Sequence, residues 1–154
     1  MSENLDDLYR DIIMEHYKYP RGKKRLEDPD VTSEGKNPVC GDEIEMKLKV
    51  NQNRIEDISI DCLGCAISVA SGSMLVDAIR GKSITEVRRI ASAIKAILKG
   101  EKPDEDLELG DLEALEGVKK FPVRIKCALL SWTTLIEGLK NWENGKKNEV
   151  ITTE

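Results

Sequence analysis

Residues 43–50 alternate strictly between apolar and charged side chains, and this pattern constrains the fold more than any other feature of the chain. A two-residue period is typical of a strand with one buried face. The apolar positions are Ile44, Met46, Leu48 and Val50. Residues 51–53, Asn-Gln-Asn, read as a turn, and 54–62 supply a second strand with the same period. We therefore expect an antiparallel hairpin with one face against a core.

Helical periodicity accounts for most of the rest of the chain. It predicts helices over 5–18 behind Asn4, over 65–81 ending at a glycine C-cap, and over 83–100 behind a capping box of Ser83 and Glu86. A short helix is expected at 112–115, and Pro122 opens a last helix over 123–141. The single histidine, His16, is expected on a helix surface or half-buried.

Together these patterns predict an α+β fold, a small three-stranded antiparallel sheet with helices packed on one side. The third strand is expected near 31–33. The whole chain, 1–154, reads as a single domain with no internal repeat, and residues 143–154 read as a flexible tail.

Charge and apolar content exclude two classes of partner. The chain has 24 Lys+Arg against 29 Asp+Glu, a net charge of -5, and no basic run broken by aromatic residues, so nucleic acid is not expected. No aliphatic stretch is long enough to predict a membrane span, and the N-terminus carries no secretory pattern. We expect a cytoplasmic, reducing environment, in which four cysteines indicate metal binding, catalysis or burial before disulfides.

The four cysteines differ in their settings. Cys62 shares a strand face with apolar residues and is expected to be buried as a small hydrophobe, although Cys62 and Cys65 also form a lone CxxC that leaves a redox pair open. Cys65 opens a helix whose free N–H groups stabilise a thiolate. Cys127 follows two cations, Arg124 and Lys126, which also favour a thiolate; burial on an apolar stripe is the alternative.

Asp42 lies two residues after Cys40, in a loop shaped by a proline and a glycine. Alone, such a carboxylate is more often a turn cap. With three thiols it can complete a four-coordinate site of three sulfurs and one oxygen, a donor set that zinc accepts. The carboxylate is the harder ligand and the natural one to exchange in a soft site.

Three motifs resemble the NifU N-terminal, IscU and SufU family of iron–sulfur cluster assembly proteins. They are Asn-Pro-Val-Cys-Gly-Asp at 37–42, Gly-Cys-Ala-Ile-Ser at 64–68 and Arg-Ile-Lys-Cys at 124–127, and the likeness covers about 5–140. Two departures from the IscU pattern resemble the SufU branch. Lys126 stands where IscU-type proteins carry a histidine, and the acidic stretch at 107–111 is similar to the SufU insertion.

This resemblance implies a SufE/NifU-like fold and one zinc ion per chain on Cys40, Asp42, Cys65 and Cys127. It implies that Cys40 accepts persulfide sulfur from a pyridoxal-phosphate cysteine desulfurase of the SufS type, with Arg124 and Lys126 in support. Cys62 has no counterpart in the pattern. The chain would be a sulfur-transfer partner of the desulfurase and no stand-alone enzyme.

Two other readings stay open. The protein could be a scaffold on which Cys40, Cys65 and Cys127 hold a transient [2Fe-2S] cluster that passes to apo iron–sulfur proteins or downstream assembly proteins. It could also be a structural metal module, which would unfold on chelation.

Overall fold

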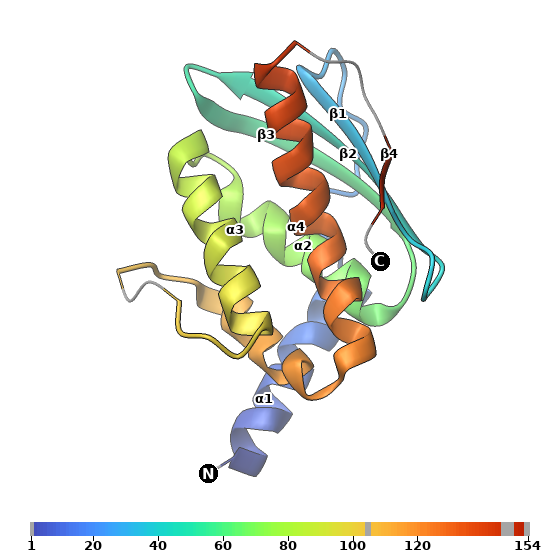
Figure 1. Cartoon of the computed structure of the whole chain (residues 1–154), viewed down its shortest axis with the longest axis vertical. Coiled ribbons are helices and arrows are strands. Elements are labelled where there is room, and N and C mark those ends of the chain that lie inside the picture. The colour runs from blue at the N-terminus through green and yellow to red at the C-terminus, as the bar shows by residue number, and fades with distance from the viewer. Residues whose placement is uncertain (1, 104–105, 146–149, 153–154) are drawn as a thin grey trace.

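The computed structural model describes residues 2–103, 106–145 and 150–152, and its helices and strands follow the predicted order (Figure 1). The helices are α1 (Ser2–Lys18), α2 (Ala66–Ile79), α3 (Ile84–Leu98), the 3-10 helix η1 (Gly110–Lys120) and α4 (Pro122–Glu143). The strands are β1 (Val31–Asn37), β2 (Asp42–Asn51), β3 (Arg54–Leu63) and β4 (Val150–Thr152).

The strands form one sheet in the order β3-β2-β1-β4. The predicted hairpin is confirmed, because β2 and β3 pair antiparallel with Met46 opposite Ile60. β1 pairs antiparallel with β2 over its whole length, and it is longer than the expected strand at 31–33. The three-stranded antiparallel sheet is therefore present.

A fourth strand, β4, was not predicted and lies within the segment expected to be a flexible tail. It pairs parallel with β1 over three residues, Glu34 to Lys36. Of that segment, Glu143 ends α4, 144–145 form a turn, and 146–149 and 153–154 lie outside the described residues. A strand of three residues is too short to show a hydrophobic period in the sequence.

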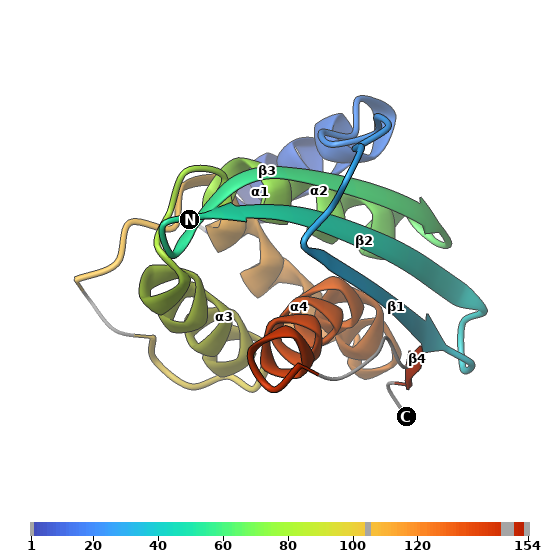
Figure 2. The ribbon, with the colours of Figure 1, turned by 90° about the horizontal axis from the view of Figure 1, so that it is seen from above.

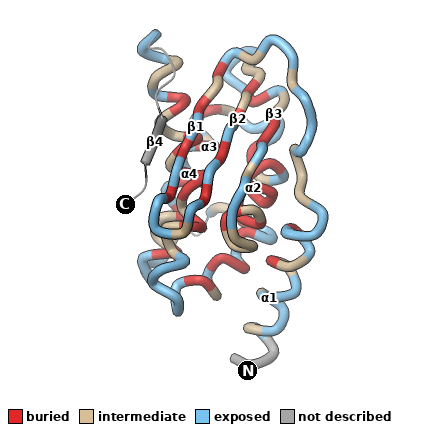
Figure 3. Tube along the Cα trace, turned by 90° about the vertical axis from the view of Figure 1, so that its right-hand side faces the viewer, coloured by how far each residue is buried: buried red, intermediate tan, exposed pale blue. Residues whose placement is uncertain are grey.

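The helices cover one face of the sheet, as predicted (Figure 2). α4 packs against β1 and α2, and α1 packs against α2. Burial alternates along β2, whose inward side chains are buried while the glutamates between them are exposed (Figure 3). Trp132 of α4 is fully buried in the same core, and its indole N–H donates to Ser71 Oγ of α2 at 3.1 Å.

A glycine in β1 sets the distance between the sheet and α4. A Cβ atom on Gly35 would lie only 2.0 Å from Thr134 Oγ1, so any other residue would force the helix away. Two residues further on, β1 ends at the turn that carries Cys40. The glycine thus allows α4, which carries Cys127 seven residues before Thr134, to pack closely against β1.

His16 is fully buried, which corrects the expectation of a surface or half-buried residue. Its Nδ1 lies 2.7 Å from Ser73 Oγ of α2, and its Nε2 lies 3.0 Å from Asp111 Oδ2 of η1. A buried polar ring needs such partners. The imidazole therefore connects three helices, and only tertiary packing supplies the two contacts that allow its burial.

Among the described residues, no helix is both long enough and apolar enough to cross a bilayer.

Candidate metal centre

The turn between β1 and β2 carries the first predicted ligands. Asn37 ends β1 and pairs with Asp42, which begins β2, so four residues connect the strands. Gly41 has a φ of +72°, a left-handed conformation that favours glycine in a tight turn. This places Cys40 on the turn, partly exposed, whereas Asp42 is 1% exposed at the base of the hairpin.

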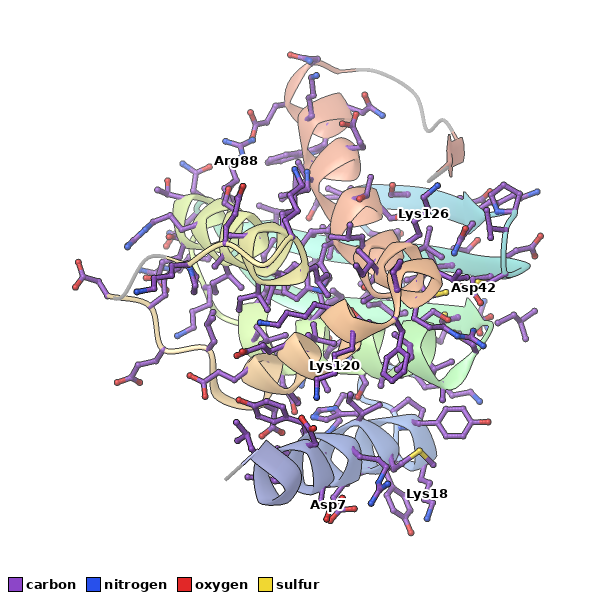
Figure 4. All side chains as sticks on the ribbon, turned by 60° about the horizontal axis from the view of Figure 1, so that its bottom comes forward. Asp7, Lys18, Asp42, Arg88, Lys120 and Lys126 are labelled. Carbon is purple, nitrogen blue, oxygen red and sulfur yellow. The ribbon has the colours of Figure 1, made fainter. Side chains whose placement is uncertain are left out.

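Cys127 reaches the same turn from α4. Its side chain is fully buried, and its Sγ lies 3.1 Å from the Sγ of Cys40. One ligand atom from each of Cys40, Asp42 and Cys127 lies within 4.8 Å of the other two. Two thiols and a carboxylate at this spacing can hold a metal ion. In Figure 4, Asp42 lies at the end of the sheet beside the first turns of α4.

Cys65 borders this group but is not one of the three residues whose ligand atoms meet within 4.8 Å. It is the N-cap of α2, and its backbone N–H donates to Asp42 Oδ1 at 2.9 Å. Burial opposes ionisation of the thiol, but hydrogen bonds from the backbone N–H and hydroxyl of Ser68 lower the pKa of Cys65. The lowered pKa expected for a thiol at a helix start is confirmed.

Gly64 allows Asp42 to approach the start of α2. A Cβ atom at Gly64 would lie 2.3 Å from Asp42 Oδ1 and 2.6 Å from Ser68 Oγ. No side chain fits in that space without moving the carboxylate. The Gly-Cys pair at 64–65 is therefore needed for both the thiol and the position of the carboxylate.

The pKa of Cys127 differs from the sequence prediction. Burial, with Cys40 and Asp42 as close neighbours, raises the pKa of this thiol, whereas the nearby cations were expected to lower it. The reason is geometric, since the thiol points into the protein among other acidic groups. A divalent cation bound there would supply the missing positive charge.

The two predicted supporting residues behave differently. Arg124 is exposed, and the thiols of Cys127 and Cys65 raise the pKa of its guanidinium, so it faces the site. Lys126 is half-buried on the same helix (Figure 4), and it is not among the groups that shift the pKa of the thiols. Of the two, Arg124 is the one that the structure brings to the thiols.

Asn37 belongs to the site, although the sequence analysis assigned it no role beyond membership in a motif. It is fully buried, and its Nδ2 lies 3.3 Å from Asp42 Oδ2 and 3.5 Å from Cys127 Sγ. The available signal was its place as the last residue before the turn. Its contact with Cys127 spans 90 residues of sequence, which only the folded chain reveals.

Cys62 is partly buried on β3 opposite Ile44, in keeping with the expected packing role. Burial raises its pKa to about 11. All four cysteines are free thiols. A thiol that stays protonated at neutral pH is a poor nucleophile, which disfavours the redox CxxC reading.

Four large apolar side chains that lie near the thiols in the sequence are exposed. They are exposed by 59–70% and lie within six residues of a thiol in the sequence. They are Val39, Leu63, Phe121 and Val123. Contiguous patches of exposed apolar groups mark surfaces that contact other proteins, and these four side chains are candidates for such a contact.

Comparisons with known proteins agree with this picture. Residues 8–146 match the family model described as NifU-like N terminal domain. The chain is 44% identical over 142 residues to the zinc-dependent sulfurtransferase SufU of Bacillus subtilis (strain 168), covering 92% of this chain and 96% of that one. It is 38% identical over 142 residues to the iron–sulfur cluster assembly scaffold protein IscU of Streptococcus pyogenes serotype M1, covering 92% and 89%.

Solved structures show the same fold. The crystal structure of FiSufU from Fervidobacterium islandicum AW-1 matches with a TM-score of 0.79 at 33% identity, covering 83% of this chain and 93% of that one. A NifU-like protein (N-terminal) from Brucella abortus matches with a TM-score of 0.82 at 23% identity, covering 90% and 96%, a likeness of fold alone.

Proposed function

The chain belongs to the family of NifU-like N-terminal domains, and from this premise we propose that it is an iron–sulfur cluster assembly protein that accepts persulfide sulfur from a cysteine desulfurase. The observation that carries the proposal is the thiol of Cys40, partly exposed on a turn and 3.1 Å from the buried thiol of Cys127. We propose that the protein acts in the cytoplasm.

The donor set fits zinc. Three of the four proposed ligands, Cys40, Asp42 and Cys127, already lie within 4.8 Å of one another, and Cys65 is tied to Asp42 by its backbone. Three sulfurs and one oxygen suit a tetrahedral zinc ion. When bound, zinc would keep the thiols in the thiolate form that burial disfavours for Cys127.

Cys40 is the proposed sulfur acceptor because it is the ligand on the exposed turn. Its thiolate attacks the terminal sulfur of the desulfurase persulfide, a new S–S bond forms at Cys40, and the old S–S bond breaks. The desulfurase cysteine leaves as a thiolate, so no oxidant is needed. Arg124, which faces the thiols, offsets the negative charge of the attacking and departing sulfurs.

A protein donor is also supported by four exposed apolar side chains that lie within six residues of a thiol in the sequence, Val39, Leu63, Phe121 and Val123. A desulfurase covering these side chains would exclude water from the exchanging sulfurs. We propose that Cys40 then passes its sulfur to apo iron–sulfur proteins or downstream assembly proteins.

Sulfur uptake tests the proposal. Zinc-loaded protein is mixed with a SufS-type desulfurase and free cysteine, and the mass gained by the chain is measured under non-reducing conditions. The wild type should gain sulfur, Cys40→Ala should gain none, and the matched control Cys62→Ala should behave as the wild type. Equal uptake rates in Cys40→Ala and wild type would reject the proposal.

Similarity to a named IscU scaffold supports a second candidate, a [2Fe-2S] cluster held by Cys40, Cys65 and Cys127. Anaerobic purification separates the two. Brown protein that contains iron favours the scaffold, and colourless protein with one zinc per chain favours sulfur transfer.

A further inference from the structure

Asn37 makes two side-chain contacts, and both go to proposed metal ligands. Its Nδ2 lies 3.3 Å from Asp42 Oδ2 and 3.5 Å from Cys127 Sγ. A primary amide nitrogen carries two hydrogens, so it can donate to both atoms at once. The reverse orientation would place the amide oxygen against the carboxylate, so the nitrogen faces the site.

The oxygen end of the amide indicates that Asn37 does more than fill space in the core. Its Oδ1 is the one buried side-chain polar atom of the described residues without a hydrogen-bond partner. Burying an acceptor without a partner costs stability, and a leucine of the same branched shape would avoid that cost. What the amide contributes, and leucine would not, is the pair of N–H groups directed at Asp42 and Cys127.

Cys40 lies outside this arrangement. It stands on the turn at 38–41, between Asn37 and Asp42, and is partly exposed, whereas Asn37, Asp42 and Cys127 are at most 1% exposed. The site thus has a buried part at the base of the hairpin and a partly exposed part on the turn.

We infer that Asn37 is a positioning residue that holds Asp42 and Cys127 in their metal-binding geometry independently of Cys40. This inference rests on the proposed function, because it explains how zinc stays on the chain when Cys40 leaves to accept sulfur. Fixed donors to metal ligands orient those ligands, and their loss commonly lowers metal affinity 10- to 100-fold.

Zinc affinity, measured by competition with a chromophoric chelator, tests the inference with the metal alone. Asn37→Leu, which keeps the branched shape, and the smaller Asn37→Ala should each bind zinc about 10- to 100-fold more weakly than the wild type. Ser33→Ala is the matched control. Ser33 is also a buried residue of β1, but its hydroxyl donates to the carbonyl of Thr134, away from the thiols. It should bind zinc as the wild type does.

Independence from Cys40 is tested in a second background. Cys40→Ala lowers zinc affinity by itself, and adding Asn37→Leu should lower it by the same factor as in the wild type, because non-interacting changes are additive. If adding Asn37→Leu to Cys40→Ala left the zinc affinity unchanged, Asn37 would act through Cys40, and the inference would be overturned.

A measurement on the unaltered protein covers the case in which the Asn37 variants fail to fold. In ¹⁵N-labelled wild type, the two Nδ2 protons of Asn37 should shift and exchange more slowly with water when zinc is added. Unchanged amide signals, or Asn37→Leu affinity within twofold of wild type, would overturn the inference while leaving wild-type sulfur uptake intact. Wild type that binds no zinc would overturn it together with the zinc site.

Discussion

The backbone N–H of Cys65 donates a 2.9 Å hydrogen bond to Oδ1 of Asp42, so the start of α2 and the start of β2 meet at one carboxylate. On its other oxygen the same carboxylate contacts the amide of Asn37. Asp42 is therefore held from two sides before any metal binds.

Gly64→Ala should damage this contact. The new methyl group would lie 2.3 Å from Asp42 Oδ1, so the carboxylate must move out of its place. We expect zinc affinity to fall about 10- to 100-fold, measured by chelator competition.

The matched control is Gly72→Ala, within α2. Its Cβ would meet Ile60 at 3.6 Å, an ordinary contact, and alanine favours a helix over glycine by about 0.5–1 kcal/mol. Gly72→Ala should bind zinc normally and unfold at equal or higher urea concentration. Normal zinc affinity in Gly64→Ala would contradict the role of Gly64.

Alkylation of the metal-free protein should distinguish the two cysteines of the CxxC. The pKa of Cys65 is lowered and that of Cys62 is raised to about 11, so at pH 8 a larger fraction of Cys65 is thiolate. Iodoacetamide should therefore modify Cys65 first, as read by peptide mass spectrometry. Modification of Cys62 should accelerate up to about pH 11. Preferential labelling of Cys62 at pH 8 would contradict the raised pKa of its thiol.

The same thiol makes stability depend on alkaline pH. Because the folded state keeps Cys62 protonated above its ordinary pKa of 9.0, the unfolded chain loses this proton first. The stability due to neutral Cys62 is thus fully present below pH 9 and decreases until about pH 11. Urea unfolding of metal-free wild type and Cys62→Ser at pH 8 and pH 10.5 should show a smaller loss in the variant.

His16→Leu should destabilise the fold, because the ring bridges Ser73 and Asp111 from a fully buried position. We expect a loss of about 1–3 kcal/mol in the free energy of unfolding by urea. Asp111→Asn is the control. The Asp111 side chain is 55% exposed, so its loss should cost less than about 1 kcal/mol. Equal stability of His16→Leu and wild type would show that the buried contacts contribute nothing.

Chelation tests the reading of the site as a purely structural module. Met46, Leu48 and Trp132 are fully buried in a core built from apolar side chains of the sheet and the helices. We therefore expect far-UV circular dichroism to stay unchanged on adding EDTA. The melting temperature should fall, because the free energy of unfolding loses the zinc-binding contribution, about 2.7 kcal/mol at a zinc concentration 100 times Kd. Loss of the helical signal on chelation would support the structural module.

The periodic parts of the fold were predictable from the sequence. The alternation at 43–50 predicts β2, and helical spacing predicts α2, α3 and α4, because burial of one face imposes those periods. β4 and the burial of His16 depend on pairing with distant segments, which leaves no local pattern.

The residues that meet at the site were easier to predict from the sequence than the pKa of the Cys127 thiol. Motifs brought together Cys40, Asp42 and Cys127, which the fold places within 4.8 Å of one another. The cations near Cys127 in the sequence suggested a lowered pKa, but the thiol is buried and its pKa is raised. Asn37 carries no charge or thiol, so its contacts emerge only in three dimensions.

The edges of the sheet are already occupied. Along β3, Ile60 donates its N–H to Gly22 and Ile55 donates to Lys82, while β4 lies along β1 at the other side. Covered or very short edges resist the addition of a strand from another chain. We therefore expect a partner to dock away from the flanks, at the end of the sheet that carries the turn with Cys40, so that docking and access to this thiol would coincide.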